Sequence, residues 1–505
     1  MFAKVYGSTT LGLQGMLITV EVDIANGIPG CDIVGLPDTS VRESRERVRA
    51  AIKNSGFEFP NRRITINLAP ADIKKDSAGL DLPIAIGILA ASGQISREKC
   101  SDMLFVAELS LDGMLRPVSG VLSMAMNGIS CRLPTVFVAE ANSKEALIAG
   151  DITVYAPPSL KQLVQYLCGE INLQPCASAT NEVEECGYSE NFAEVQGQTT
   201  AKRAMEIAAA GGHNVLMIGP PGSGKTMLAR RITTILPPMT RQEALEVTKI
   251  YSVAGLFHTQ SIINSRPFRS PHHTVSTAGM IGGGTVPRPG EVTLSHNGVL
   301  FLDELPEFPR MVLEVMRQPM EDGEVTISRV NASLSYPAKF MMIAAMNPCP
   351  CGFLGDPVKN CTCSDNEIRR YVKKISGPLL DRIDLHVHVP RPEYGELTTR
   401  RPAEDSKSIA SRVGSARQIQ VKRLQAYKIS CNASMGHRHI RAMCPMTEEG
   451  QAILQQAFLK MNLSARSFDR IIKVARTIAD LAGEDIISAS HIAEAISFRN
   501  HMQNM

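Results

Sequence analysis

One short segment constrains this chain more than any other: a glycine-rich loop between an apolar run and a helical stretch. Residues 219–226 match the phosphate-binding pattern G-x-x-x-x-G-K-[ST] at every fixed position, and they read Gly219, Pro220, Pro221, Gly222, Ser223, Gly224, Lys225 and Thr226. In a strand–loop–helix context, the backbone N–H groups of such a loop can point at phosphate oxygens. The pattern therefore predicts that Lys225 contacts the β and γ phosphates of ATP and that the Thr226 hydroxyl ligates Mg²⁺. The alternative is a glycine-rich turn without a ligand.

Length and composition exclude several classes of protein. With 505 residues the chain is too long for one ordinary core, and roughly two to four domains are expected. The net charge of +3 neither requires nor excludes nucleic acid, so any basic surface must be local. The longest apolar run, 82–91, is too short to span a membrane, and residues 1–6 do not begin a signal peptide. We expect a cytoplasmic protein without a membrane partner.

Composition and periodicity divide the chain into four parts. Residues 1–170 alternate short strands with helices, and residues 171–191 form a polar, mildly acidic stretch that predicts a linker. An ordered surface loop is the alternative for that stretch. Residues 192–392 hold the phosphate-binding pattern, and residues 393–505 begin as a basic segment and continue as a helical bundle. The expected fold class is α/β.

Polar side chains follow two further apolar runs. One run ends in Asp303 and Glu304, and another ends in Asn347. A carboxylate at the end of a strand can hold Mg²⁺ beside Thr226, and Glu304 can act as the general base that polarises the attacking water. The Asn347 amide can hydrogen-bond that water or the γ-phosphate. The alternatives are a solvated acidic pair and a turn-forming asparagine before a proline.

Four of the twelve cysteines lie close together in the sequence. They form two C-x-C pairs separated by nine residues: Cys349, Cys351, Cys361 and Cys363. Four thiolates at this spacing could form a tetrahedral Zn²⁺ site. The alternative is a loop with incidental or redox-active thiols, because spacing alone does not fix geometry. The other eight cysteines are scattered, as expected for reduced thiols in the cytosol.

Together with Leu-Leu-Asp-Arg-Ile-Asp at 379–384 and Leu-Ser-Ala-Arg at 463–466, these segments resemble an AAA+ ATPase. The branch is the one shared by magnesium chelatase I-subunits and MCM helicases. More closely, Asn-Pro-Cys-Pro-Cys-Gly at 347–352 and Phe-Arg-Ser-Pro-His-His-Thr at 268–274 are similar to the bacterial YifB/ComM family, which is magnesium-chelatase-like. The resemblance covers nearly the whole chain.

The resemblance implies an AAA+ P-loop domain, with a parallel sheet between two helical layers, and a C-terminal helical lid. It implies that Arg382 is an arginine finger that enters the site of a neighbouring subunit, and that Arg466 is the second sensor of the γ-phosphate. A site completed between subunits implies a homo-oligomeric ring, a hexamer by family analogy. Without the resemblance, each arginine could equally be a solvated surface residue.

A hairpin is predicted over residues 325–336, with a turn at 331–333. In the related MCM helicases a hairpin at this place enters the pore of the ring, and Arg329 is the nearest match to its basic residue. Such an arginine would contact DNA phosphates without reading bases. The alternative is a hairpin packed on the domain surface.

A basic segment follows the predicted nucleotide domain. It could bind the phosphate backbone of a nucleic acid, or it could be an ordinary solvated helix. Its cations are Arg400, Arg401, Lys407, Arg412, Arg417, Lys422, Arg423, Lys428, Arg438 and Arg441.

Two adjacent histidines invite a metal hypothesis. His272 and His273 lie on a segment read as extended, where neighbouring side chains point in opposite directions. We therefore expect a structural or interface role for them rather than a shared metal ion.

The N-terminal region resembles the catalytic domain of Lon proteases, an α+β fold of the ribosomal S5 domain 2-like type. That family uses a Ser-Lys dyad, and Ser77 lies in the matching serine segment. Leu122 stands where the lysine is expected, so the base needed to activate the serine is missing. A rearranged dyad with Lys74 or Lys75 is the alternative to a loss of proteolysis.

The resemblance implies a DNA motor that couples ATP hydrolysis to translocation, with branch migration during integration of transforming DNA. A magnesium-chelatase-type motor that acts on a protein partner is the second hypothesis. A protein-remodelling or protease-like factor built on the N-terminal domain is the third.

Overall fold

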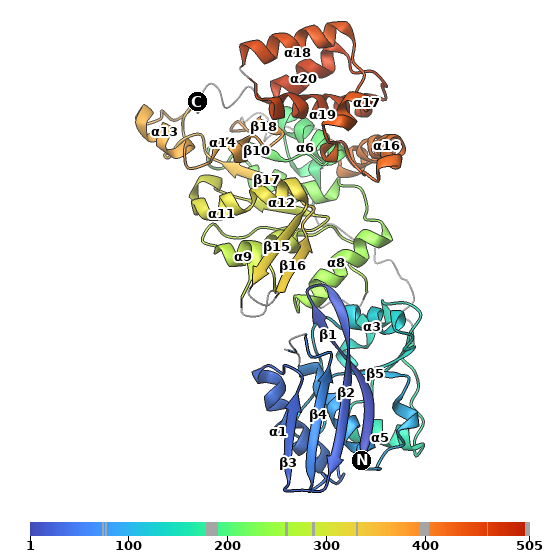
Figure 1. Cartoon of the computed structure of the whole chain (residues 1–505). Coiled ribbons are helices and arrows are strands. Elements are labelled where there is room, and N and C mark those ends of the chain that lie inside the picture. The colour runs from blue at the N-terminus through green and yellow to red at the C-terminus, as the bar shows by residue number, and fades with distance from the viewer. Residues whose placement is uncertain are drawn as a thin grey trace.

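The structure is a computed structural model, and it forms two lobes (Figure 1). It describes residues 1–72, 75, 78–177, 190–257, 261–284, 288–329, 332–392, 403–461 and 463–499, without the side chains of residues 39–40, 328–329 and 332–333. One lobe is built on an N-terminal sheet, and the other holds a second sheet and the C-terminal helices. Among the helices of these ranges, none is long and apolar enough to cross a membrane.

The N-terminal lobe holds a seven-stranded mixed sheet in the order β3-β4-β2-β1-β5-β8-β9. β1 and β2 form a long antiparallel hairpin, whereas β5, β8 and β9 continue the sheet in parallel. Its strands are β1 (Phe2–Leu11), β2 (Gln14–Ala25), β3 (Gly30–Val34), β4 (Arg63–Ala69), β5 (Met103–Val106), β8 (Thr135–Val138) and β9 (Thr153–Tyr155). A two-stranded ribbon accompanies them, β6 (Glu108–Leu109) and β7 (Leu115–Arg116). The helices are α1 (Thr39–Asn54), α2 (Asp81–Ala91), α3 (Val121–Ser130), α4 (Ser143–Leu147) and α5 (Leu160–Cys168).

The helix α2 lies at the centre of this lobe. All of its residues are buried, as the apolar run at 82–91 predicts for a core helix. It packs on one face of the sheet. Buried and less buried residues alternate along β4, and Ile64, Ile66 and Leu68 are fully buried on that face. Every second residue of β4 is buried because one face of the strand packs against the helix. Every residue of α2 is buried because further elements cover the rest of the helix.

The second sheet has five parallel strands in the order β11-β14-β17-β10-β18. These strands are β11 (Phe268–Arg269), β14 (Val299–Leu302), β17 (Met341–Met346), β10 (Val215–Ile218) and β18 (Leu385–His388). Each residue of β10, β14 and β17 is buried, because helices cover both faces. Two short ribbons lie beside this sheet, β12 (Gly282–Gly283) with β13 (Arg288–Pro289), and β15 (Glu324–Arg329) with β16 (Ala332–Pro337).

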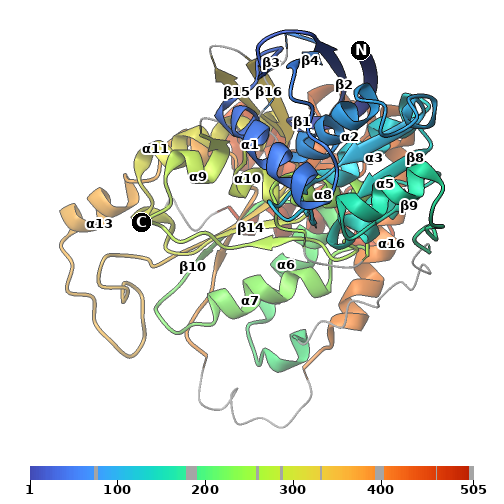
Figure 2. The same cartoon turned by 90° about the horizontal axis from the view of Figure 1, so that it is seen from below.

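Figure 2 shows helices on either side of the second sheet. One side carries α6 (Thr199–Gly211) and α7 (Lys225–Arg231), and it packs against the C-terminal helices. The other side carries α9 (Thr277–Ile281), α10 (Glu291–Leu294) and α11 (Arg310–Val315). The remaining helices of this lobe are α8 (Arg241–Val253), α12 (Arg317–Asp322), α13 (Asp365–Val372), α14 (Gly377–Leu380), α16 (Ser406–Leu424), α17 (His437–Met443), α18 (Glu448–Lys460), α19 (Ala465–Ala482) and α20 (Ala489–Ser497). The α/β class with a C-terminal helical region is confirmed.

The two lobes meet where α8 lies against α3. The Gly120 N–H donates to the Ser252 carbonyl at 3.1 Å, and the Ser252 hydroxyl donates to the Glu145 carboxylate at 2.5 Å. The Glu145 carboxylate is buried and also accepts the Leu122 N–H at 3.0 Å. The predicted boundaries at 170, 191 and 392 stay predictions, because residues 178–189 and 393–402 lie outside the described ranges.

Candidate functional site

The glycine-rich loop joins β10 to α7, as the strand–loop–helix pattern predicts. Three of its positions require glycine. A Cβ at Gly219 would overlap the carbonyl oxygen of Val389, and Gly222 and Gly224 have left-handed φ values of +76° and +86°. The loop can therefore present backbone N–H groups without a side chain in their way.

Four predicted site residues come together at the carboxyl end of the second sheet. The Thr226 hydroxyl donates to the Asp303 carboxylate at 2.8 Å. The Lys225 ammonium donates to the Gly219 and Pro220 carbonyls at 2.8 and 2.9 Å, and to Asn347 Oδ1 at 3.3 Å. Burial lowers the pKa of Lys225, and the Asp303 and Glu304 carboxylates oppose that shift. A hydroxyl, an ammonium, a carboxylate and an amide in contact form a set that can hold a Mg²⁺–triphosphate.

Glu304 follows Asp303 in a left-handed conformation, with a φ of +53°. Left-handed φ is uncommon outside glycine, and such positions gather at functional sites. The Glu304 N–H donates to Asp303 Oδ1 at 3.0 Å, and the Glu304 side chain is exposed. The geometry leaves its carboxylate free of the Thr226–Asp303 pair.

His273 is a residue of this site that the sequence did not place here. Its Nδ1 lies 3.5 Å from Glu304 Oε2. The expectation that the two histidines point in opposite directions is wrong, because the ring centroids of His272 and His273 are 4.0 Å apart. The segment turns at this point, with the Val275 N–H bonded to the His272 carbonyl, so the alternation of an extended strand does not apply.

The two arginines of the resemblance meet at one carboxylate. Arg382 Nη2 lies 2.6 Å from Glu321 Oε1 on α12, and Arg466 Nη2 lies 3.8 Å from the same atom. The Arg382 side chain is buried, and its Nη1 donates to the Pro378 carbonyl at 2.7 Å. The Arg466 side chain is 60% exposed at the start of α19. One acid therefore holds the pair together at the surface of the lobe.

A buried network fixes the backbone next to Arg382. Arg470, on α19, donates to the Arg382 carbonyl at 2.8 Å and also pairs with Asp384. Burial alone would raise the pKa of Asp384, but Arg470 and His213 hold it well below its ordinary value. The one local sign of this network in the sequence is that Arg470 follows Arg466 by four residues, at helical spacing.

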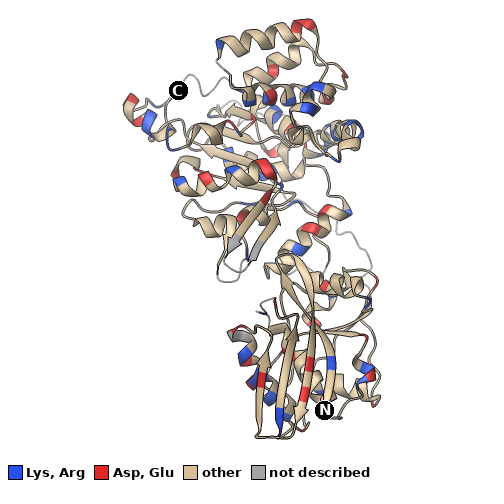
Figure 3. Cartoon of the chain, viewed as in Figure 1, with Lys and Arg blue, Asp and Glu red and all other residues tan. Residues whose placement is uncertain are grey.

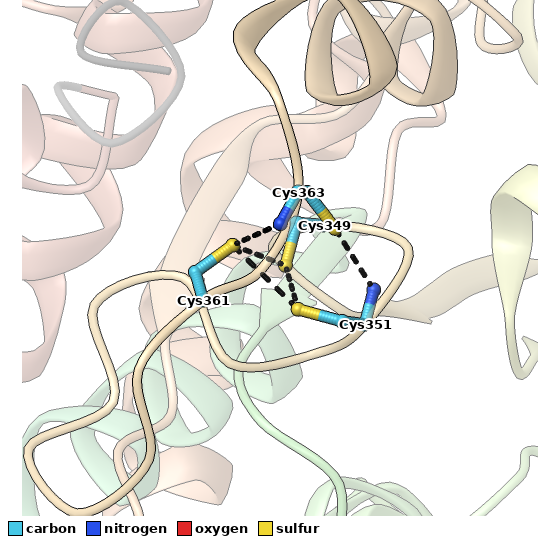
Figure 4. Close-up of side chains that lie close together, drawn as sticks. All are labelled: Cys349, Cys351, Cys361 and Cys363. Atoms are coloured by element: carbon cyan, nitrogen blue, oxygen red, sulfur yellow. Dashed lines mark hydrogen bonds between the residues drawn. The ribbon is translucent and has the colours of Figure 1, made fainter.

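The four clustered cysteines converge in space (Figure 4). Their sulfur atoms all lie within 4.8 Å of one another. The N–H groups of Phe353 and Thr362 lower the pKa of the Cys351 thiol to about 6, whereas burial raises the pKa of Cys349. No other group of three or more His, Cys, Asp or Glu side chains in the described ranges could hold a metal ion.

The predicted hairpin exists as β15 and β16, with Arg329 paired to Ala332 at its described end. Val325, Ile327 and Tyr336 are buried at its base. The Arg329 side chain and residues 330–331 lie outside the described part, so the pore and surface alternatives both stay open.

The basic segment is less available to a ligand than its composition indicates. Figure 3 shows several Lys and Arg positions in blue along the ribbon of α16. However, Arg412 pairs with Glu206 and Glu404, Arg417 donates to the Ala209 carbonyl at 2.7 Å, and Arg423 pairs with Asp480 at 2.7 Å. These three cations hold α16 onto the lobe, while Arg400 and Arg401 lie outside the described residues.

The dyad position of the N-terminal lobe is apolar. Leu122 is fully buried on α3, whereas Ser77 and Lys74 lie outside the described residues. Lys75 is fully buried, and its ammonium donates to the Gly35 carbonyl at 2.9 Å and also to the Pro70 carbonyl. Burial lowers the pKa of Lys75.

Three family models match parts of this chain. The family model described as magnesium chelatase, subunit ChlI, matches residues 191–397. Related models described as subunit ChlI of Mg-chelatase and as the ChlI C-terminal part match residues 20–142 and 403–499.

Two full-length relatives are similar to the chain from end to end. Competence protein ComM of Haemophilus influenzae is 44% identical over 505 residues, which cover 98% of this chain and 97% of the relative. The uncharacterized protein YifB of Escherichia coli is 43% identical over 98% of this chain and 96% of its own length. A magnesium-chelatase 38 kDa subunit of Cereibacter sphaeroides is 24% identical over 43% of this chain and 64% of its own length.

Proposed function

This chain belongs to the magnesium-chelatase-like YifB/ComM family, and on that premise we propose that it hydrolyses ATP as a ring-forming AAA+ motor that moves DNA. One observation carries the ATPase part of the proposal: Thr226 Oγ1 lies 2.8 Å from Asp303 Oδ2 at the mouth of the phosphate-binding loop. Two oxygen ligands at hydrogen-bond distance, from a loop and from the end of a strand, are what Mg²⁺ bound to ATP requires.

Each residue of this site has a role in the proposal. Thr226 and Asp303 hold Mg²⁺, which neutralises charge on the phosphates when bound. Lys225 leaves its carbonyl partners to contact the β and γ phosphates. Glu304 polarises the attacking water as general base, and the Asn347 amide orients it. The residues that line the backbone cradle are Gly219, Pro220, Pro221, Gly222, Ser223 and Gly224.

The arginine pair supports assembly into a ring. Arg382 and Arg466 share Glu321 and have no described contact with the phosphate loop of their own chain. An arginine finger acts by stabilising charge on the transferred phosphoryl group, often from a neighbouring subunit. We propose that this pair completes the site of the next subunit, in a homo-oligomer that is a hexamer by family analogy.

DNA is the proposed substrate of the motor. The similarity to a competence protein over nearly the full length of both chains supports translocation on DNA, with branch migration as its outcome. The hairpin formed by β15 and β16 would place Arg329 against phosphates, without base readout. The motor would act in the cytoplasm, with the N-terminal lobe as a Lon-like domain that lacks the dyad lysine.

Zinc is the third proposed cofactor, beside ATP and Mg²⁺. The four sulfur atoms of the cysteine cluster lie close enough to share one ion. A site with four thiolate ligands is closed to substrate and therefore structural.

An ATPase assay with a panel of nucleic acids tests the proposal. Phosphate release by the full chain is measured without DNA and with single-stranded, duplex and branched DNA, for the unaltered protein and for Arg329→Ala. We expect branched DNA to stimulate turnover and Arg329→Ala to remove that stimulation. Stimulation by a protein fraction but not by DNA would favour the magnesium-chelatase-type motor. Peptide cleavage that Ser77→Ala abolishes would favour the protease-like alternative.

A further inference from the structure

The cysteine cluster has the dimensions of a metal site. The Cys349 sulfur lies 3.3 Å from the Cys351 sulfur and 3.6 Å from the Cys361 sulfur, and the Cys351 and Cys361 sulfurs are 3.5 Å apart. Four sulfurs around Zn²⁺, each at about 2.3 Å, would lie about 3.8 Å from one another. These three thiols therefore need to move apart by only a few tenths of an ångström to accept the ion, and the Cys363 sulfur lies within 4.8 Å of each of them.

The backbone around the cluster already orients the sulfurs. The Cys351 N–H donates to the Cys363 sulfur at 3.4 Å, and the Cys363 N–H donates to the Cys361 sulfur at 3.4 Å (Figure 4). Outer hydrogen bonds of this kind fix the direction of ligands and stabilise thiolates. Four soft sulfur donors select zinc over Mg²⁺ or Ca²⁺, which prefer oxygen.

The loop that carries these thiols touches the phosphate-binding loop. A Cβ added to Gly352, which has a φ of +87°, would lie 2.7 Å from Pro221 Cδ and 3.9 Å from Asn347 Cγ. Gly352 thus packs directly against Pro221 of the phosphate-binding loop and lies beside Asn347, whose amide is proposed to orient the attacking water. Only a residue without a side chain allows this approach.

The far end of the loop returns to the same place. Cys363 is followed by α13, whose Tyr371 lies near Asn347: burial raises the pKa of Tyr371 to about 12, and the Asn347 N–H group opposes that shift. Between β17 and α13 the chain has no helix or strand of its own, although all of its residues there are described. A metal ion that cross-links the four cysteines would therefore restrict the conformation of this segment strongly.

We propose that the cluster binds one zinc ion, and that this zinc clamps the loop so that Gly352 seats Pro221 and Asn347 in the conformation that accepts a nucleotide. The metal takes no part in the chemistry. It sets the shape of the nucleotide site from behind the phosphate loop. The clamp role rests on the proposed nucleotide binding, whereas the zinc content can be measured without it.

The metal itself is tested by elemental analysis of the full chain purified under reducing conditions. We expect about one zinc per chain in the unaltered protein and in Cys131→Ser, whose exposed thiol lies outside the cluster. In Cys361→Ser we expect less than about a tenth of a zinc per chain, because three thiolates hold the ion much more weakly. Titration with a fluorescent ATP analogue should show its Kd raised about tenfold, roughly the cost of ordering one loop residue again.

A glycine pair tests the clamp without touching a ligand. Gly352→Ala should keep its zinc but raise the Kd of the analogue about tenfold, because the new methyl group pushes on Pro221. The matched control is Gly355→Ala in the same loop. Gly355 also has a positive φ, +76°, but a Cβ there has no atom within 4 Å. Gly355→Ala therefore carries the same kind of backbone strain without the contact, and its Kd should stay within about twofold.

Three results would overturn the inference. Less than about a tenth of a zinc per chain in the unaltered protein, or a disulfide among the four thiols, would remove the metal site. Zinc that is lost from Cys361→Ser without a change in Kd, or equal Kd values for the two glycine variants, would remove the clamp. Stoichiometric zinc in a protein that binds no nucleotide would instead overturn the proposed ATPase together with the clamp, and leave the metal site standing.

Discussion

The phosphate-binding side and the arginine-bearing side of the second lobe differ in how much of a site one chain supplies. On the first side, Thr226, Asp303, Lys225 and Asn347 contact one another across three neighbouring parallel strands. On the other side, Arg382 and Arg466 gather around Glu321, which is a carboxylate of the same chain rather than a phosphate.

This contrast bears on where the proposed chemistry is completed. A site that lowers a phosphoryl-transfer barrier needs cations at the oxygens where charge develops. The phosphate-binding side has Lys225 and two ligands for Mg²⁺ but no arginine among its described contacts. The arginine side has two cations and only an acid to neutralise them. Each side supplies what the other lacks, which supports the proposal that two copies of the chain form the complete site.

The largest expected effect is on the phosphate-binding side. Lys225→Ala should raise the Kd for ATP by about 100-fold or more, because it removes a buried ammonium that would otherwise make charge-assisted bonds to two phosphates. Fluorescence titration measures the Kd, with Lys53→Ala on the exposed face of α1 as the control. Retention of normal affinity would show that the loop does not bind phosphate. The proposed role of the phosphate-binding side would then be wrong.

The next effect belongs to the arginine side. Arg382→Ala should lower the turnover number by roughly 10³-fold with little change in the Kd for ATP, as loss of an arginine finger does. Because Arg382 is buried, a thermal melt must accompany the assay to show that the variant folds.

Mixing decides whether the arginine acts between chains. An assembly of equal parts Arg382→Ala and Lys225→Ala contains some interfaces with an intact loop on one chain and an intact arginine on the other. With random mixing, about a quarter of all interfaces are of this kind, so the mixture should recover up to about a quarter of full turnover. A mixture as inactive as its components would place Arg382 in the site of its own chain.

The third prediction separates binding from chemistry on the phosphate-binding side. Glu304→Gln should lower the turnover number by about 10²–10⁴-fold, the usual contribution of a general base, while the Kd for ATP stays within about twofold. Single-turnover phosphate release and a titration give the two values. A variant with weakened binding and normal turnover would assign Glu304 to ligand positioning instead.

The two sides also differ in how far the sequence predicted them. Asp303 and Asn347 each follow an apolar run that becomes a parallel strand, and the carboxyl ends of parallel neighbours meet at one edge of a sheet. The convergence of these residues near Thr226 could therefore be predicted from local patterns alone. The place of His273 could not, because β11, the strand before it, is only two residues long, and the position of β11 beside β14 depends on the order of the strands.

The arginine side depends on contacts between segments far apart in the chain. Glu321 lies on α12, Arg382 in the turn after α14 and Arg466 on α19, and no local pattern indicates that one acid serves both arginines. The same reason explains α16, whose arginines appear free in the sequence but pair with residues such as Glu206 and Asp480. The residue types indicated cations, but only the tertiary fold shows what neutralises each one.

The smallest change in rate is expected at Glu321, the carboxylate that pairs with both arginines. We expect Glu321→Gln to raise basal ATP turnover by about two- to fivefold. An ion pair with one partner 40% exposed contributes at most about 1 kcal/mol, and releasing that amount shifts the population of free Arg382 by no more than this factor. Steady-state phosphate release at fixed protein concentration measures the change.

Glu314→Gln is the matched control, since it also breaks an ion pair on the adjoining helix, to Arg317 at 2.6 Å, without touching either arginine of the site. If Glu321 competes with phosphate for Arg382, ATP turnover should rise in Glu321→Gln and stay unchanged in the control. A fall in turnover would mean instead that Glu321 orients Arg382 for catalysis. In that case a Glu321→Asp variant, which keeps the charge on a shorter side chain, should recover part of the lost rate. If Glu321 instead competes with phosphate, Glu321→Asp should raise turnover, but by less than Glu321→Gln does.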